Sequence, residues 1–236
     1  MSEGNQALWY LDNIDVIGIF CPQKLGPEEM ERHVHKRYKR GEYIYLPEEM
    51  ADRVFFLTEG RVKIGAYADN GKEITKAILG PGEVFGELSV IAEGKKRHDY
   101  AYAMEDTTVC AVTVPTMKSL LRDRSALNLF MLRIMGSRML ELEQRLESLM
   151  FKDSRTRIVE FIVDTTLKKG QRVGYEWVVR KFITHQEIAN LTATSRQTVT
   201  TVLNDLRNKN LITFDRRRLL VRDLEKLQDE AAKGEG

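Results

Sequence analysis

The most constraining stretch of the sequence lies near its middle, in residues 125–150, which read SALNLFMLRIMGSRMLELEQRLESLM. It contains no proline, and apolar side chains recur there at alternating intervals of four and three residues. This heptad spacing is typical of a helix that packs along a partner helix, although a core helix of a single domain can also show it over so short a length. The predicted dimerisation seam consists of Met135, Met139, Leu142, Leu146 and Leu149.

The charge of the chain is divided unevenly on the two sides of this seam. Residues 1–150 hold 20 Lys/Arg and 23 Asp/Glu, a net of −3, whereas residues 151–236 hold 17 and 12, a net of +5. A basic C-terminal part predicts a polyanionic partner, although a solvated basic surface has the same composition. No apolar run reaches membrane-spanning length and the first residues lack a signal-peptide pattern, so we expect a cytoplasmic protein with no membrane partner.

Before the seam, the sequence has the pattern of many short strands. Segments of five to eight β-rich residues alternate with turns such as Gly80-Pro81-Gly82, which predicts an all-β barrel or sandwich. Asn70-Gly71 predicts a hairpin, because both residues tolerate positive φ. We expect Cys21 and Cys110 to be buried thiols, and two cysteines are too few for an iron–sulfur cluster that needs four.

The chemistry of this N-terminal part falls in one segment, PGEVFGELSVIAEGKKRHDYAYA. Gly86-Glu87-Leu88-Ser89 interrupts the strand pattern and predicts a turn of helix, whose amide groups can bind an anion. Glu87 can accept hydrogen bonds from ribose hydroxyls, and Arg97 can hold a phosphate through two parallel hydrogen bonds. A tight turn followed by a surface arginine is the simpler interpretation of the same residues.

The last third of the chain predicts two helices joined by a short turn, in ITHQEIANLTATSRQTVTTVLNDLRNKNLI. Thr184 followed by Glu187 forms a capping box at the start of the first helix, and Ser195 can cap the second. This is the plan of a helix-turn-helix, and the following ITFDRRRLLVRD predicts a two-stranded wing. The predicted DNA-contacting residues are Thr184, His185, Gln186, Ser195, Arg196, Gln197, Thr198, Thr200, Thr201, Arg216 and Arg217.

Both functional segments resemble one known family. The glycine-punctuated strands followed by FGELS and Arg97 are similar to the phosphate-binding cassette of a cyclic nucleotide-binding domain. The helix-turn-helix segment resembles that of the cAMP receptor protein/FNR regulators, and the likeness covers roughly residues 20–222. The resemblance implies an α+β chain with a cyclic nucleotide-binding-type β-roll (a double-stranded jelly roll) in residues 1–118, a dimerisation helix in residues 119–150 and a winged helix-turn-helix in residues 151–236.

The resemblance also implies a function. It describes a homodimeric, sequence-specific transcription regulator that is controlled by a small nucleotide-like anion in the β-roll. The implied partners are palindromic double-stranded DNA, a second copy of the chain and RNA polymerase. The implied effector-binding residues are Gly86, Glu87, Leu88, Ser89, Arg97, His98, Leu142 and Glu143.

Several residues depart from the family pattern. His98 stands where cAMP-binding members have a serine, and Leu142 and Glu143 stand where they have a Thr-Ser pair that holds adenine. We therefore expect a cyclic nucleotide or another anionic small molecule as the effector, and we expect cAMP itself to bind poorly. In the second helix, Gln197 replaces an acidic residue of the family and Thr201 replaces an arginine.

Two alternatives remain beside this hypothesis. One is a regulator of the same family that needs no ligand or senses haem or redox state; by residue type alone, the axial ligands would come from His33, His35, His98 and Cys110. The other is a regulatory module of an enzyme or channel, in which a helix-turn-helix with a basic wing would have no purpose. The sequence contains no HExxH, Walker A or GxSxG motif, so it predicts no catalytic residue and no metal site.

Overall fold

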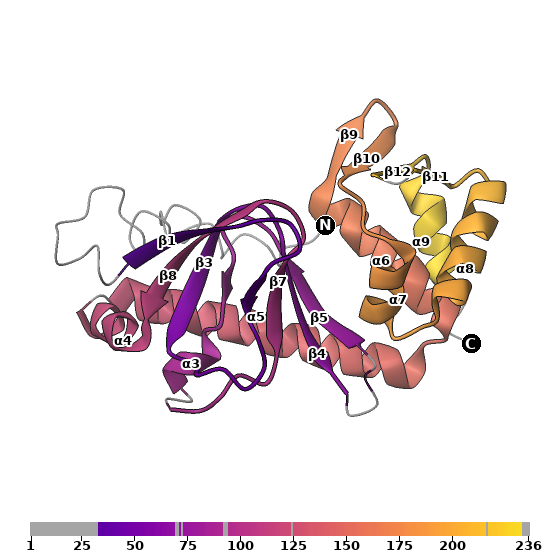
Figure 1. The fold of residues 1–236 in the computed structure, drawn as a ribbon. Coiled ribbons are helices and arrows are strands. Elements are labelled where there is room, and N and C mark those ends of the chain that lie inside the picture. Colours follow the sequence, from indigo (N-terminus) through magenta and orange to yellow (C-terminus); the bar gives the residue numbers. More distant parts are fainter. Residues whose placement is uncertain are drawn as a thin grey trace. The chain divides into compact units, whose positions relative to one another are not determined.

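The computed structural model describes residues 33–68, 71, 73–91, 94–123, 125–215 and 217–232, and the chain divides into two compact units, Met1–Ser137 and Arg138–Gly236 (Figure 1). Helices and antiparallel sheets occur in both units, which confirms the predicted α+β class. The first unit contains β1 (His33–Tyr38), β2 (Tyr43–Tyr45), β3 (Arg53–Glu59), β4 (Val62–Tyr67), β5 (Glu73–Leu79), β6 (Val84–Phe85), α3 (Leu88–Ile91), β7 (Tyr100–Ala103), β8 (Thr107–Thr113) and α4 (Val114–Asp123). Helix α5 (Ser125–Phe151) crosses the boundary between the units.

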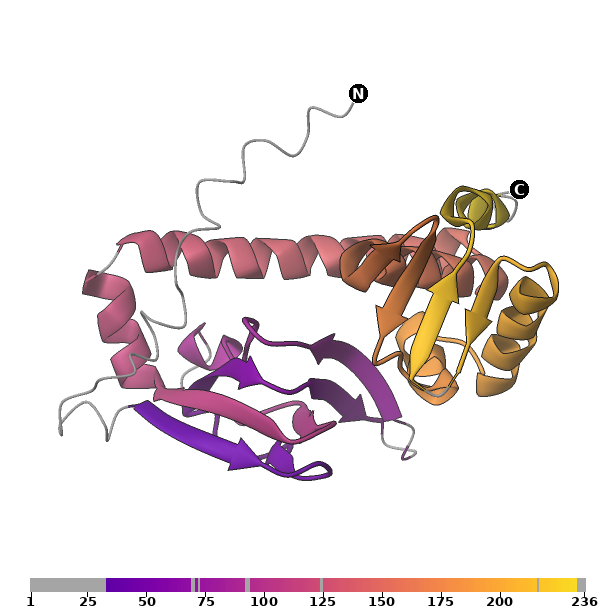
Figure 2. The same cartoon turned by 90° about the horizontal axis from the view of Figure 1, so that it is seen from above.

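The strands of the first unit form two four-stranded sheets, ordered β1-β8-β3-β6 and β2-β7-β4-β5. Side chains alternate between the two faces of a strand. In β8, Val109 and Ala111 join a core cluster with residues of the second sheet, whereas Cys110 and Val112 join a cluster with Met117 of α4 and the first turns of α5. The first sheet is therefore buried on both faces, which confirms the predicted β-roll, and Figure 2 shows α4 leading into α5 beside it.

Two further sequence predictions can be compared with this unit. Strands β4 and β5 pair antiparallel, as the predicted hairpin requires, although Asn70 itself lies outside the described residues. Cys110 is fully buried as predicted, but it is disulfide-bonded and not a free thiol. Cys21 lies outside the described residues.

Helix α5 changes its surroundings along its length. Leu127 and Met131 are buried against the first sheet, and Met135 is partly buried in the same cluster. The first residue of the predicted seam thus packs within its own chain, because it falls on the face that the β-roll covers. The exposed heptad positions of α5 are Leu132, Met139, Leu142, Leu146 and Leu149. The predicted three-part division of the chain stays a prediction.

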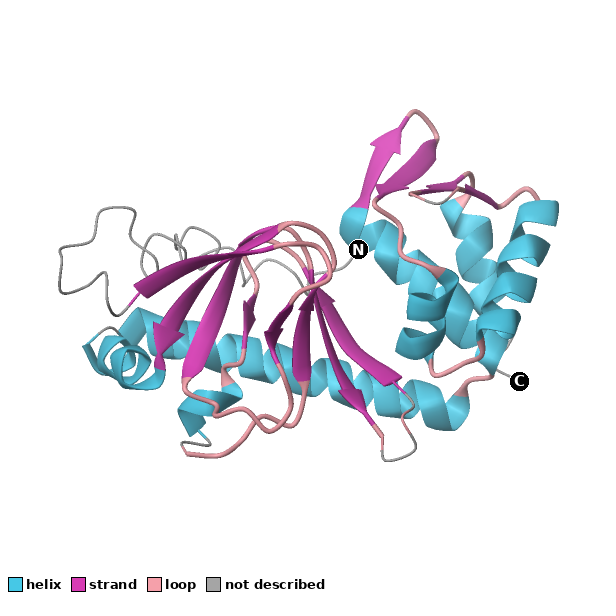
Figure 3. Ribbon diagram, viewed as in Figure 1, coloured by secondary structure: helices cyan, strands magenta, loops and turns pink. Residues whose placement is uncertain are grey.

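The second unit contains α6 (Ser154–Lys169), β9 (Gly170–Val173), β10 (Glu176–Arg180), α7 (His185–Thr192), α8 (Arg196–Asn208), β11 (Ile212–Phe214), β12 (Arg218–Val221) and α9 (Leu224–Ala232). Figure 3 shows its helices and its sheet, which has the order β11-β12-β10-β9. Side chains of the four helices and of β10, β11 and β12 form one apolar core. Ion pairs join three of the helices: Arg155 of α6 lies 2.6 Å from Asp205 of α8 and 3.0 Å from Glu230 of α9. These ion pairs connect α6, α8 and α9, and the shared apolar core joins α7 and the hairpin of β11 and β12 to them.

Candidate DNA-binding and effector sites

The first helix of the helix-turn-helix begins at the predicted capping box. The amide of Glu187 donates to Thr184 Oγ1 at 3.2 Å, and the amide of Thr184 donates to Glu187 Oε2 at 2.8 Å. Each side chain thereby satisfies an amide that the helix itself leaves without an acceptor. The sequence prediction for the start of α7 is confirmed.

The turn between the two helices depends on Ala193. Its backbone is left-handed, with φ of 50° and ψ of 47°, and its amide donates to Ala189 O. Two residues later Ser195 caps α8, since its Oγ accepts from the amide of Thr198 at 3.0 Å. Helix α8 therefore starts directly after the turn, as predicted.

Helix α8 has one buried face and one polar face. Val199, Val202, Leu203 and Leu206 are buried in the core of the second unit. The side chains of Ser195, Arg196, Gln197 and Thr201 are exposed, while Thr198 and Thr200 are partly buried. The first turn of α8 thus presents a guanidinium and an amide to solvent, as a recognition helix requires.

His185, the first residue of α7, contacts α8 and β11. Its Nδ1 is 3.0 Å from Thr200 Oγ1, and its ring meets the ring of Phe214 edge-on at 5.6 Å between centroids. Because Thr200 Oγ1 donates to Arg196 O at 2.9 Å, we assign the hydrogen of the shared bond to His185 Nδ1. Burial lowers the pKa of His185, and the nearby charge of Arg196 lowers it further. His185 was predicted as a DNA contact, and its packing against α8 and β11 was not visible in the sequence.

The hairpin of β11 and β12 matches the predicted wing. At its tip, Asp215 accepts from the amide of Arg217 at 2.7 Å and from Nε of Arg218 at 3.1 Å. The hydrogen bond from the Arg217 amide has the largest effect, and together these bonds hold the pKa of Asp215 below its usual value. The Arg217 side chain is exposed, whereas Arg216 lies outside the described residues.

In the β-roll, Arg97 is buried, with 6% of its surface exposed. Its Nη2 donates to Arg53 O at 2.8 Å, and its guanidinium lies 3.9 Å from the centroid of the Tyr45 ring. Short pairings of the segments around Glu49 and Arg97 fix its backbone, since the Arg97 amide donates to Glu49 O at 2.9 Å. Arg97 is therefore a packing partner of the aromatic core and not a surface arginine.

Gly86 and Arg97 are brought together as the sequence predicted. Gly86 has φ of 72°, and a Cβ at this position would lie 2.9 Å from Arg97 Nη1, so only glycine fits there without displacement. Glu87 beside it is 5% exposed. Gly86 and the Arg97 guanidinium thus meet next to Tyr45, and the buried Glu87 directly follows Gly86 in the chain.

Two amides of the turn that follows Gly86 are bonded within it. The amides of Ser89 and Val90 donate to Gly86 O at 3.2 Å and to Glu87 O at 3.0 Å, so an anion-binding role of the amides after Gly86 stays a prediction and would fall to those of Glu87 and Leu88. The buried Ser89 hydroxyl donates to Gly86 O at 2.7 Å. Leu88 and His98 are exposed.

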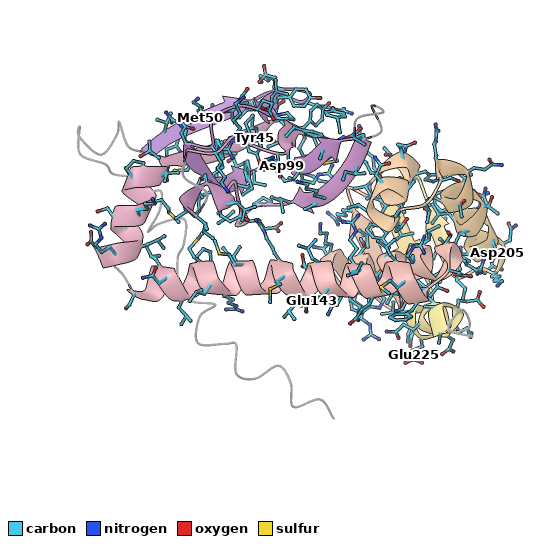
Figure 4. The ribbon with its side chains drawn as sticks, turned by 90° about the horizontal axis from the view of Figure 1, so that it is seen from below. Tyr45, Met50, Asp99, Glu143, Asp205 and Glu225 are labelled. Carbon is cyan, nitrogen blue, oxygen red and sulfur yellow. The ribbon has the colours of Figure 1, made fainter. Side chains whose placement is uncertain are left out.

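Sequence reasoning missed two residues beside Arg97, namely Tyr45 and Asp99, which Figure 4 labels in the β-roll. Burial raises the pKa of Tyr45, and Asp99 raises it further through its charge and a hydrogen bond, whereas Arg97 opposes the shift. Asp99 is paired with Lys76 at 3.1 Å. Aromatic and acidic groups therefore border Arg97. Their proximity depends on how the strands pair in the folded chain, which the sequence does not show.

Comparison with known proteins gives two domain matches. Residues 35–124 match the cyclic nucleotide-binding domain, and residues 156–230 match the Crp-like helix-turn-helix domain. The global nitrogen regulator of Nostoc sp. is 31% identical over 189 residues, which cover 80% of this chain and 85% of that protein. The chain belongs to the CRP/FNR family of transcription regulators.

Other relatives agree with this assignment. The CRP-like cAMP-activated global transcriptional regulator of Mycobacterium tuberculosis is 28% identical over 82% of this chain and 86% of that protein. The structure of a CooA mutant from Carboxydothermus hydrogenoformans is similar with a TM-score of 0.78 and 26% identity, over 93% of this chain and 96% of that one. As a CRP/FNR protein with a DNA-binding domain, the chain is a regulator and not an enzyme.

Other residues predicted for this CRP/FNR chain lie on α5. Leu142 is 65% exposed, and Glu143 extends from α5 into solvent (Figure 4). Both belong to the second unit, so their assignment to the effector pocket stays a prediction. The candidate haem ligands are not favoured by their surroundings, because the sulfur of Cys110 is already disulfide-bonded and His35 and His98 are exposed.

Among the residues that the structure describes, no group of three or more histidine, cysteine or acidic residues is placed to hold a metal ion. None of the helices in this described part combines the length and the apolar composition that crossing a membrane requires.

Proposed function

We propose that this CRP/FNR regulator is a homodimer that reads a palindromic DNA site under the control of an anionic, nucleotide-like effector in the β-roll. The observation that carries the DNA part is the exposed pair Arg196 and Gln197 in the first turn of a capped, well-packed α8. Arginine suits O6 and N7 of guanine, and glutamine suits N6 and N7 of adenine. We expect a G·C pair read by Arg196 with an A·T preference beside it, and fewer fixed G·C pairs than a second arginine at the position of Thr201 would specify.

The exposed apolar positions of α5 support a dimer. A stripe that runs from Leu132 to Leu149 along one helix is unusual on a surface that faces water. Burying it against a second copy can contribute several kcal/mol at about 25 cal/mol per Å². Two-fold symmetry would then place the half-sites about one helical turn, or ~34 Å, apart.

The contact between Gly86 and Arg97 supports the effector part. A buried guanidinium beside a glycine turn and the Glu87 carboxylate can hold a phosphate and a hydroxyl-bearing sugar. Leu142 and Glu143 offer adenine no neutral donor and acceptor pair, so we expect cAMP to bind poorly. RNA polymerase and the cytoplasm are the partner and location that such a regulator requires.

Selection of binding sites from random DNA tests the DNA part. The wild type should select a palindrome, and Arg196→Ala should weaken binding by about 1–3 kcal/mol per half-site and relax the choice at one base pair. Asn208→Ala, at the exposed far end of α8, is the matched control and should select the wild-type bases. If wild type and Arg196→Ala select the same bases at every position, Arg196 does not read the sequence.

Calorimetry with cAMP, and DNA binding by protein stripped of small molecules, test the effector part. We expect weak or no cAMP binding and low DNA affinity in the stripped protein. Tight, saturable cAMP binding would contradict our interpretation of Leu142 and Glu143. Full DNA affinity in the stripped protein would favour a ligand-independent regulator.

The disulfide at Cys110 favours a second candidate, in which redox state controls DNA binding. Dithiothreitol distinguishes the two candidates, because it leaves an effector site intact and opens a disulfide. Unchanged DNA affinity after reduction supports control by an effector. A changed affinity, in protein whose melting temperature is unaltered, supports control by redox state.

A further inference from the structure

Two arginines from outside the helix-turn-helix cover the C-terminal end of α7. Arg145 of α5 donates through Nη2 to Leu191 O at 2.6 Å and to Asn190 O at 3.4 Å. Arg157 of α6 donates through Nε to Thr192 O at 3.0 Å and through Nη2 to Ala193 O at 3.3 Å. Four consecutive carbonyls at the end of one helix are thus bound by two guanidinium groups.

The end of a helix is suited to such contacts. Its last carbonyls have no partner within the helix and carry a partial negative charge, so a nearby cation is stabilised there. Arg145 is partly buried, and this burial lowers the pKa of its guanidinium, which stays charged at any physiological pH. A partly desolvated charge that ends on these carbonyls is a specific contact and not a loose surface one.

The two arginines differ in what they connect. Arg157 also donates through Nη1 to Lys152 O at 2.6 Å, so it stays within the junction where α5 passes into α6. Arg145 lies six residues before the end of α5, well before the short connection of Lys152 and Asp153. It therefore gives α5 a second attachment to the helix-turn-helix, separate from the covalent one.

The attachment point lies next to the recognition helix. Leu191 is followed by the Ala193 turn and by Ser195, which caps α8. A body held to α5 only through a short linker can rotate about that linker. A second contact at some distance from the linker removes this rotation and fixes the direction of α8 relative to α5.

We propose that Arg145 is a positioning residue for DNA reading, which sets the separation of the two recognition helices in the dimer by tying each α7 to its own α5. The inference rests on the proposed function, because it needs a dimer on α5 and two half-sites. Its consequence is specific: Arg145 should determine which half-site spacing is accepted, not which bases are read.

The test compares wild type, Arg145→Met and Arg145→Lys on palindromes whose central spacer is the selected length, two base pairs shorter or two base pairs longer. Methionine keeps an apolar stem and removes every donor. We expect it to bind the selected palindrome about tenfold more weakly and to discriminate less between spacers, while it selects the same bases within each half-site as the wild type does. Lysine keeps one charged donor group and should restore part of the discrimination. Gln144→Met, an exposed neighbour on α5, should behave as the wild type.

A purely structural role for Arg145 would weaken binding to every spacer by the same factor. Wild type and Arg145→Met would then discriminate equally between spacers, and that result would overturn the proposal. If Arg145→Met does not fold, Arg145→Gln gives the same comparison, since its shorter side chain cannot reach the Leu191 carbonyl as arginine does. Failure of the wild type itself to bind any palindrome would instead contradict the proposed function.

Discussion

At the scale of single residues, Ala193 carries backbone strain that the helix-turn-helix requires. An alanine with φ of 50° is disfavoured, because its Cβ crowds the carbonyl that follows, and glycine has no such cost. We expect Ala193→Gly to raise the free energy of unfolding of the second unit by about 0.5–1 kcal/mol. Urea unfolding followed by Trp177 fluorescence measures this, in a Trp9→Phe background that leaves Trp177 as the one tryptophan.

A glycine elsewhere in the same unit serves as the control for this experiment. Gln228 is exposed and lies inside α9, where backbone geometry is ordinary. Gln228→Gly should destabilise the unit by about 1 kcal/mol, since glycine loses more conformational freedom in a helix. A loss of stability in Ala193→Gly as well would show that the turn is not strained at Ala193.

His185 makes the stability of the second unit depend on pH. Its pKa in the folded protein lies below the usual 6.5, so as pH falls through 6.5 the unfolded chain binds a proton before the folded one does. The free energy of unfolding should therefore fall between pH 7.5 and pH 5.5 and be fully retained above this window. His185 is the one histidine of this unit, since the others are His33, His35 and His98.

His185→Asn tests the origin of that dependence, because its amide can still donate to Thr200 but does not titrate. Urea midpoints of the Trp177 transition at pH 7.5 and pH 5.5 should differ in the His185 protein and coincide in the asparagine variant. The same pH dependence in both proteins would assign the effect to another group.

At this scale, contacts between residues close in the chain could be predicted from the sequence, and contacts between distant segments could not. The capping box of Thr184 and Glu187 and the cap at Ser195 were predictable, because capping acts between residues three apart in the chain. The burial of Arg97 against Tyr45 was not, since it depends on how distant strands pair. The contacts of Arg145 were invisible as well, because backbone carbonyls accept hydrogen bonds whatever residue carries them.

At the scale of elements, the exposed heptad positions of α5 predict a dimer interface. Leu142 and Leu146 lie at exposed heptad positions, so Leu142→Glu with Leu146→Glu places two charges on each side of the proposed seam. We expect this protein to sediment as a monomer and to lose specific DNA binding, because one half-site binds too weakly alone. Sedimentation velocity and DNA titration measure the two effects.

The matched control places the same charges on the same helix outside the heptad positions. Leu140 and Met150 are both exposed on α5, and Leu140→Glu with Met150→Glu should remain dimeric. A protein with glutamate at 142 and 146 that still sediments as a dimer would contradict the proposed interface.

The heptad pattern predicted an apolar stripe on α5 but not which of its residues also pack against the β-roll. The spacing of apolar residues is the same whether a helix face packs against a sheet or against a second helix. Met135 lies where the β-roll reaches α5, whereas Leu132 stays exposed. Periodicity could therefore predict the stripe but not the point where the packing partner changes.

At the scale of the whole molecule, charge is concentrated where DNA is expected to bind. Residues 151–236 carry 17 Lys/Arg against 12 Asp/Glu, although the chain has a net charge of only +2. Part of this basic charge is already paired, since Arg155 and Lys209 contact Asp205 and Glu230. Phosphate contacts must therefore come from exposed arginines such as Arg217 at the wing.

Arg217→Ala should weaken binding to every DNA sequence and make its salt dependence shallower. Each lost phosphate contact lowers the slope of log K against log salt by about 0.9, so a dimer that loses two contacts should lose about 1.8. Titrations of selected and scrambled DNA at several salt concentrations measure the slope. Lys36→Ala, which removes an exposed cation on β1, should leave the slope unchanged.

Arg196→Ala should instead weaken binding mainly to the selected site, because a base contact is lost when the base is changed. A slope unaltered by Arg217→Ala would place the wing away from the phosphates, and the basic charge of this unit would then need another explanation.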